Sequence, residues 1–210
     1  MSYRVFDSHC DTPVELWRQE KQLKNSDLAV SLDKAAHLGG YAQFFAFCTA
    51  WLQTRMPHPE HFARALDYFL TQLQKNAEQI TLCRTACEAE AAMQRGTCAA
   101  FLSIEGAEAV REDEGLLEPA YEKGVRMISL VWNLPNSLAG SCQSGEGLSE
   151  KGKSFFRRAQ RLGMLVDVSH LSEKGFWDMA ELAEKPIVAS HSNSTAICPH
   201  PRNLTDAQFR

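Results

Sequence analysis

The chain has 210 residues, a net charge of −4 and a hydrophobic content of 44%, which is enough to bury the core of one domain over residues 1–210. Charges of both signs are interspersed and form no basic tract, which excludes a nucleic-acid surface and a polybasic membrane patch. No apolar run reaches the ~18 residues of a membrane-spanning helix, and an odd set of seven scattered cysteines favours free thiols in a reducing compartment, so we expect a cytoplasmic protein.

Short apolar runs alternate with longer amphipathic stretches along the chain. The expected strands are residues 3–7, 42–51, 98–104, 125–132, 164–169 and 186–190. The expected helices are residues 13–20, 61–76, 87–95, 117–123, 150–162 and 173–184. This alternation, with strands that are apolar throughout, is typical of an α/β protein with a buried parallel sheet. Six such units fit a (β/α)8 barrel or an open doubly wound sheet, and periodicity alone does not choose between them.

Two further segments carry expectations about loops and ends. Residues 133–147 are rich in Asn, Ser and Gly, and we expect them to form a lid or substrate loop. Thr205 is a candidate helix N-cap only about one turn before Arg210. A closed (β/α)8 barrel usually needs about 250 residues. If the fold is such a barrel, its about six βα units leave it incomplete, and the sequence looks truncated at its C-terminal side.

Candidate metal ligands fall at the carboxyl ends of the expected strands. They are His9, Asp11, Glu105, His170 and His191. The carboxyl ends of parallel strands meet on one face, and side chains two apart on an extended backbone, such as His9 and Asp11, point the same way. Imidazoles and carboxylates suit zinc or a similar divalent ion. Two ions about 3.5–4 Å apart, bridged by a carboxylate, would form a two-metal site.

Each of these residues taken alone has a plainer explanation. A His-x-Asp pair is more often a hydrogen-bonded surface pair, and a glutamate after a strand commonly faces a helix N-terminus, where the dipole favours it. Five such residues on one face, in a chain with seven histidines, favour the metal site. Of the other histidines, we expect His37, His58 and His61 at the surface and His200 beside the site. Cys10, which points away from its neighbours, is expected in the core.

Several segments resemble, in order, the motifs of the membrane dipeptidase (renal dipeptidase) family, which is peptidase family M19. Asp-Ser-His-Cys-Asp at 7–11 is similar to the D-x-H-x-D opening, Gly-Gly-Tyr-Ala-Gln-Phe at 39–44 to the second strand, and Ser-Ile-Glu-Gly at 103–106 to the I-E-G segment. Residues 162–170 are similar to the fifth strand, and Ala-Ser-His-Ser-Asn at 189–193, followed by residues 198–206, is close to a family signature. The resemblance covers essentially the whole chain and is to a bacterial-type member. It implies an amidohydrolase-type (β/α)8 TIM barrel.

The resemblance also implies a role for each candidate residue in a zinc-dependent dipeptidase. His9 and Asp11 would bind the first of two Zn²⁺ or other divalent ions, Glu105 would bridge both, and His170 with His191 would complete the second. A bridging water would attack the peptide carbonyl of a small dipeptide. Arg202 would hold the free carboxylate of that dipeptide, for which its planar fork is well suited. No Gly-rich phosphate loop points to another cofactor.

Two departures from the family pattern keep alternatives open. Trp132 stands where animal members carry a histidine that stabilises the oxyanion, and its indole N–H donates a hydrogen bond but carries no charge; it is a candidate substrate-binding residue. The family's catalytic aspartate would lie beyond Arg210. The alternatives are another amidohydrolase-type amide or lactam hydrolase, or a non-catalytic truncated remnant. A homodimer is the candidate assembly, with no membrane or nucleic-acid partner.

Overall fold

The computed structural model describes residues 3–52 and 54–210. The chain divides into two compact units, which are described separately. Unit 1 comprises Met1–Ser103 and Gly124–Arg126, and unit 2 comprises Ile104–Lys123 and Met127–Arg210. Within the described part of the chain, no helix is both long enough and apolar enough to cross a bilayer.

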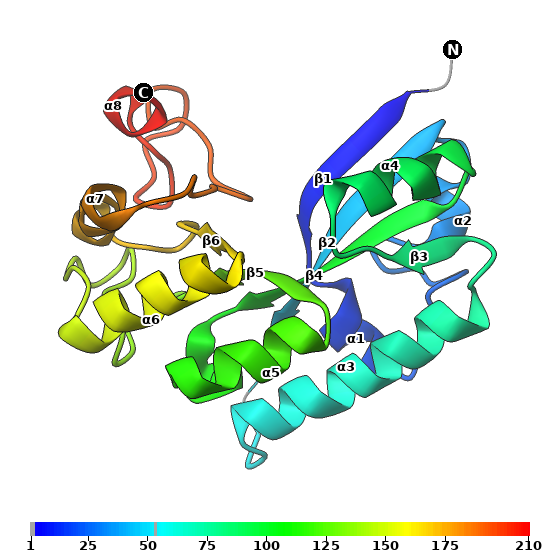
Figure 1. Cartoon of the computed structure of the whole chain (residues 1–210), viewed down its shortest axis with the longest axis horizontal. Helices are drawn as coiled ribbons and strands as arrows, with labels where there is room; N and C mark the ends of the chain where they lie inside the picture. The colour runs from blue at the N-terminus through cyan, green and yellow to red at the C-terminus, as the bar shows by residue number, and fades with distance from the viewer. Residues whose placement is uncertain (1–2, 53) are drawn as a thin grey trace. The chain divides into compact units, whose positions relative to one another are not determined.

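Unit 1 is built on parallel strands with helices between them. Its elements are β1 (Arg4–Cys10), α1 (Thr12–Arg18), α2 (Leu32–Ala35), β2 (Gly40–Cys48), α3 (His58–Lys75), β3 (Ile80–Leu82), α4 (Ala86–Gln94) and β4 (Cys98–Glu105), whose last two residues belong to unit 2. β1 lies beside β2 (Figure 1), and β3 pairs with β4, both in parallel. Every residue of β2 is buried, which explains why its sequence is apolar at every position but Gln43 and does not alternate.

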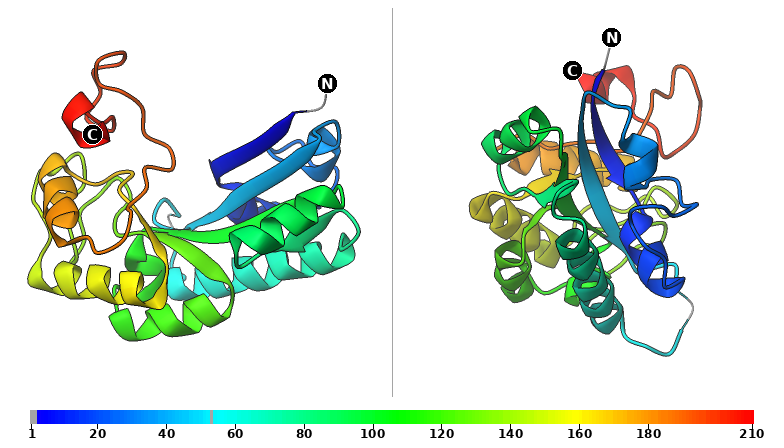
Figure 2. Two further views of the ribbon diagram at one scale, coloured as in Figure 1. Left: turned by 45° about the horizontal axis from the view of Figure 1, so that its top comes forward. Right: turned by 90° about the vertical axis from the view of Figure 1, so that its right-hand side faces the viewer.

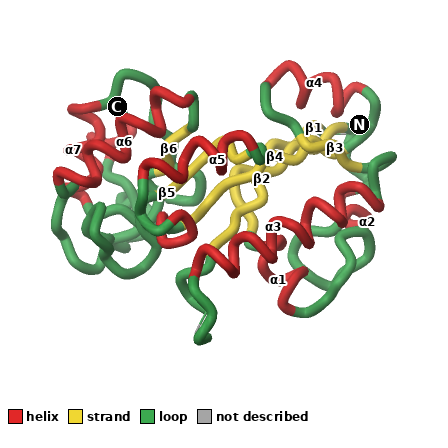
Figure 3. Tube along the Cα trace, turned by 60° about the horizontal axis from the view of Figure 1, so that its bottom comes forward, coloured by secondary structure: helices red, strands yellow, loops and turns green. Residues whose placement is uncertain are grey.

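The long helix α3 covers part of this strand layer through one apolar stripe. Phe62, Leu66, Phe69 and Leu73 recur at helical spacing and are buried. The ring of Phe69 lies 4.8 Å from that of Phe45 in β2. On its other flank α3 packs beside α1, as the trace in Figure 3 shows.

Unit 2 continues the same pattern with shorter strands. Its elements are the 3-10 helices η1 (Ala107–Val110) and η2 (Glu114–Leu116), α5 (Leu117–Glu122), β5 (Val125–Ser129), α6 (Glu150–Leu162), β6 (Leu165–Asp167), α7 (Glu173–Leu182) and α8 (Asp206–Phe209); the first two residues of β5 belong to unit 1. β5 and β6 pair in parallel. Helices α5 and α6 lie side by side, and α7 packs on α6 (Figure 2).

The strand and helix alternation expected from the sequence is confirmed, with local exceptions. Residues 186–190 do not form a strand; only Val188 bridges to Asp167. Pro186 brings no N–H, and the N–H of Ser190 is bonded to the Asp167 carboxylate instead of a neighbouring strand. β3 and α2 were not predicted, because three or four residues are too few to show a period. The N-cap at Thr205 is confirmed, with a capping box to Gln208.

One of the histidines expected at the surface is in fact buried. His61 is 3% exposed, its ring meets that of Trp17 edge-on at 5.4 Å, and its Nε2 lies 2.6 Å from the hydroxyl of Thr54. The surface prediction for His61 was wrong because the side chain falls on the face where α3 packs against α1. The prediction of one domain over residues 1–210 stays a prediction.

Candidate metal centre

Three of the five predicted ligands meet within unit 2. Glu105 is the last residue of β4, His170 follows β6, and His191 follows the segment 186–190. His170 Nε2 lies 2.8 Å and His191 Nε2 3.2 Å from the same oxygen, Oε1 of Glu105. The two Nε2 atoms are 3.0 Å apart. Glu105 is 3% and His170 7% exposed, so the cluster lies largely out of contact with solvent.

The backbone on either side of this cluster adopts conformations that are rare for ordinary residues. Gly106, directly after Glu105, has φ 87° and ψ 115°, a region open essentially to glycine alone. His170 itself has φ 69°, and its carbonyl accepts a 2.8 Å hydrogen bond from the N–H of Cys142. Such strain persists where surrounding contacts hold it, and it is concentrated at functional sites.

The ring of His170 is oriented by a side chain from the loop after β5. Asn133 Oδ1 lies 2.9 Å from His170 Nδ1. An amide oxygen only accepts, so Nδ1 donates to it. Burial lowers the pKa of His170 more strongly than the neighbouring Glu105 raises it, which favours the neutral ring. Its single proton is therefore on Nδ1, and its Nε2 lone pair faces Glu105.

The ring of His191 is also held by a hydrogen bond at its Nδ1. Its Nδ1 lies 2.7 Å from Ser190 Oγ, and that hydroxyl donates to Asp167 Oδ2 over 2.6 Å. Since the hydroxyl proton is directed to Asp167, Ser190 Oγ accepts from Nδ1–H. In the neutral ring, an Nδ1–H leaves the lone pair on Nε2.

The inward-facing donor set fits a divalent cation. Two Nε2 lone pairs and a carboxylate oxygen within 3.2 Å of one another repel unless a positive charge lies between them. Neutral imidazoles whose other nitrogen donates to a fixed acceptor, together with a carboxylate, are the usual ligands of zinc and related ions. The chemistry of these three residues therefore matches a metal site.

His9 and Asp11 form the corresponding pair in unit 1, though not on the extended backbone that the sequence suggested. The β1–β2 register shifts between Asp7 and Cys10, so a bulge re-aims this end of the strand, and Asp7 Oδ1 accepts from the N–H of His9 at 3.1 Å. Asp11 is the N-cap of α1, yet its side chain caps nothing. Instead its Oδ1 lies 3.6 Å from His9 Nε2. The two side chains do lie together, as predicted.

Cys10, between these two residues, is buried as expected. It is 8% exposed, and burial raises the pKa of its thiol to about 12. A thiol that stays protonated is a poor metal ligand. Beside it, His9, Asp11 and Glu15 face a cavity of about 440 Å³ within unit 1.

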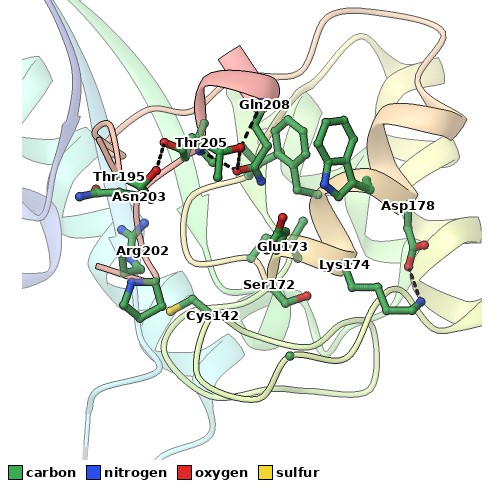
Figure 4. A pocket seen from close by; sticks show the side chains of 17 residues that line it. Cys142, Ser172, Glu173, Lys174, Asp178, Thr195, Arg202, Asn203, Thr205 and Gln208 are labelled. Carbon is green, nitrogen blue, oxygen red and sulfur yellow. Dashed lines mark hydrogen bonds and ion pairs between the residues drawn. The ribbon is translucent and has the colours of Figure 1, made fainter. Parts of the chain in front are cut away.

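Arg202 lies at the edge of a larger cavity in unit 2. The cavity has a volume of about 680 Å³; Figure 4 shows Arg202 and Cys142 on one side of it and Lys174 and Asp178 on the other. Arg202 is half-buried, and its Nη1 donates to Ser192 Oγ at 3.2 Å. Burial lowers the pKa of its guanidinium, opposed by the negative charges of groups that include Glu105.

Trp132 and His200, which were expected near the site, both lie in unit 2. The Trp132 ring is half-buried, with its centroid 6.1 Å from that of His170. The side chain of His200 is exposed, and its Nδ1 accepts from the N–H of Arg202 at 3.1 Å, so it shapes the loop that carries this arginine.

Asn133, Asp167 and Ser190 were missed as functional candidates by sequence reasoning. A signal existed for Asp167, since it is a carboxylate within the apolar run Val166-Asp167-Val168 and is 3% exposed. A buried acid needs partners, and such positions are rarely without a role. Asn133 and Ser190 belong to types common in loops, and nothing in the sequence distinguishes them.

All 210 residues of the chain match the family described as Membrane dipeptidase (Peptidase family M19). The chain belongs to peptidase family M19. The fold is accordingly an incomplete (β/α)8 barrel of the amidohydrolase type, as the motifs indicated and not the open doubly wound sheet. A metallo peptidase from Rhodobacter sphaeroides, solved with a phosphinate mimic of the dipeptide L-Ala-D-Ala, matches 100% of this chain with a TM-score of 0.87 and 29% identity.

The chain is also similar to curated proteins. A protein of Acinetobacter calcoaceticus, described as "Uncharacterized protein in PQQ-III 3'region", is 30% identical over 98% of this chain and 76% of its own length. "Dipeptidase verJ" of Clonostachys rogersoniana is 30% identical over 67% of the chain. The chain spans 70% of the Rhodobacter structure and 37% of the fungal dipeptidase.

Proposed function

We propose that this chain carries the metal centre and much of the substrate site of a zinc-dependent dipeptidase. The observation that carries the proposal is the convergence of two imidazole lone pairs, from His170 and His191, on one oxygen of Glu105. The dipeptide mimic bound to the Rhodobacter relative supports a small dipeptide as substrate. The cytoplasmic location and the homodimer stay predictions.

The proposed ligand set is binuclear. Glu105 would be shared by two ions, His170 and His191 would hold one of them, and His9 with Asp11 would hold the other; this division rests on the family motifs. The structure supports each half by its own geometry, through the 3.6 Å approach of His9 to Asp11 and the cluster around Glu105. When bound, two divalent ions would lower the pKa of a water between them and polarise the substrate carbonyl.

The protein side chains bind and orient the dipeptide. Arg202 holds the substrate carboxylate through charge-assisted hydrogen bonds, which the partial burial of its guanidinium strengthens. A carboxylate clamp at this position selects substrates whose C-terminus lies one residue beyond the cleaved bond. The indole of Trp132 beside His170 presents an apolar face and one N–H donor to the substrate.

Hydrolysis of a dipeptide panel tests this function. The purified protein is stripped with a chelator, reloaded with zinc, cobalt or manganese, and assayed against small dipeptides alongside cyclic amides. We expect hydrolysis of dipeptides that disappears with the metal and returns on reloading, and that falls at least about 100-fold in Glu105→Gln, which removes the charge of the bridging group. Metal-loaded protein that cleaves no dipeptide, or that cleaves only cyclic amides, would overturn the proposal.

A further inference from the structure

A buried carboxylate, Asp167, lies behind the cluster of Glu105, His170 and His191 and binds the segment that carries His191. It is 3% exposed at the end of β6. Its Oδ1 accepts from the N–H groups of Ser169 and Ser190, each at 3.0 Å. Its Oδ2 accepts from the hydroxyl of Ser190 at 2.6 Å and lies 4.0 Å from His191 Nδ1. Oδ1 therefore binds backbone N–H groups, whereas Oδ2 binds the hydroxyl of Ser190.

The direction of the hydrogen bonds along this chain of groups is determined. A carboxylate accepts and does not donate, so the single proton of Ser190 Oγ is directed to Asp167. The lone pairs of the same oxygen can then accept. Of the two other groups near it, Ser169 Oγ lies 3.4 Å away and His191 Nδ1 lies closer, at 2.7 Å. Meanwhile the two backbone N–H bonds to Oδ1 fix the segment that carries His191.

We propose that Asp167, acting through Ser190, is a positioning residue that sets the tautomer and orientation of His191. Asp167 orients the Ser190 proton, and Ser190 in turn holds the proton of His191 on Nδ1. The Nε2 lone pair of His191 is thereby kept facing Glu105. The inference rests on the proposed function for one step only, which is that His191 Nε2 binds a metal ion. Acceptors behind a ligating histidine act in this way when they fix its tautomer and raise its basicity.

Replacing Asp167 by asparagine reverses this direction without a change of shape. The asparagine Oδ1 keeps the two backbone N–H groups, because its amide nitrogen cannot accept them. The NH₂ group then takes the place of Oδ2 and donates to Ser190 Oγ. The Ser190 proton turns toward His191 Nδ1, and the ring proton moves to Nε2, where it faces Glu105. A ring protonated at Nε2 has no lone pair for a metal ion.

The tautomer is measured directly on metal-free protein. Long-range ¹H–¹⁵N correlation spectra of ¹⁵N-histidine protein at neutral pH distinguish Nδ1–H from Nε2–H, and His191→Gln assigns the signal. We expect Nδ1–H in the wild type and in Ser190→Thr, which keeps a hydroxyl. We expect Nε2–H in Asp167→Asn, while Ser190→Ala, which lacks the linking oxygen, shows the tautomers in mixture.

Metal affinity supplies the second readout. Competition of zinc or cobalt with a chromophoric chelator should show roughly 10–100-fold weaker binding in Asp167→Asn and Ser190→Ala. Ser190→Thr should stay close to the wild type. A matched control is Ser129→Ala, because Ser129 Oγ contacts the same Asp167 Oδ2, at 3.4 Å, but is not part of the path to His191; its affinity should also be unchanged.

The outcomes separate this inference from its alternatives. Asp167→Asn that unfolds at a lower temperature but keeps His191 as Nδ1–H would show a merely structural role and overturn the inference, as would unchanged metal affinity in Asp167→Asn. Wild-type protein that binds no metal while its tautomers behave as stated would overturn the proposed function and leave the positioning role of Asp167 supported.

Discussion

At the scale of single residues, the site depends on backbone conformations that only particular residues tolerate. Gly106 has φ 87° and ψ 115° directly after Glu105, and because it has no side chain, the chain can turn into η1 while the glutamate stays at the strand end. The glycine of the I-E-G segment is therefore explained by geometry. His170, with φ 69°, bears similar strain without being a glycine.

We expect Gly106→Ala to lower the free energy of unfolding by about 1–3 kcal/mol and also to weaken metal binding, since relief of the strain moves Glu105. The control is Gly96→Ala, where φ is 76° and, apart from its two chain neighbours, no described residue lies within 4 Å of the added Cβ. That variant should lose stability alone. Denaturant unfolding together with metal competition measures both effects, and equal metal affinity in the two variants would contradict the explanation.

Also at this scale, the sequence predicted the cluster of Glu105, His170 and His191 but not the groups that orient the rings. In a parallel α/β fold the carboxyl ends of the strands converge on one face, so the ligand positions follow once the strands are located. Hydrogen-bond partners such as Asn133 depend on loop conformation, which no period in the sequence reports. Asp11 shows the same limit, since its placement comes from a bulge and not from alternation along β1.

At the scale of elements, the packing of α3 against α1 includes an ionisable group. Burial lowers the pKa of His61 from its usual value of 6.5. The folded state then binds a proton less readily than the unfolded state. The stability that this neutral histidine contributes is complete above pH 6.5 and is lost as the pH falls from there through the lower folded pKa.

Unfolding of the metal-free protein should therefore become easier with acidification below pH 6.5, and His61→Gln should make that dependence shallower. Chemical denaturation over a series of pH values measures the slope. The control is His37→Gln, at an exposed position outside the helices, which should keep the wild-type dependence. An identical slope in His61→Gln and the wild type would show that His61 does not carry the effect.

Element boundaries were predictable where a segment was long enough to repeat its pattern. α6 has the predicted bounds of 150 and 162, with a Ser149 cap at one end and Gly163 in the left-handed region at the other. The segment 186–190 looked like a strand because it is apolar, but an apolar run does not show whether its N–H groups find a neighbouring strand. Here the Asp167 carboxylate accepts the hydrogen bond from the N–H of Ser190 instead.

At the scale of the whole molecule, metal binding and folding should be linked. The inward-facing lone pairs around Glu105 are a cost to the folded metal-free protein, and an ion that binds only the folded state stabilises it. At an ion concentration of about 100 times its dissociation constant the gain is about 2.7 kcal/mol. Thermal unfolding with and without chelator should show this shift in the wild type and a much smaller one in Glu105→Gln. Equal shifts in both proteins would place the ion elsewhere.

The most direct test of the central claim is a count of bound ions. Equilibrium dialysis of the purified protein against zinc, followed by elemental analysis, should find about two ions per chain, the number that a carboxylate-bridged site holds. Glu105→Gln should hold fewer than about one, because both ions lose their shared ligand. Stoichiometric zinc that is retained unchanged in Glu105→Gln, or wild-type protein that retains none, would contradict the account.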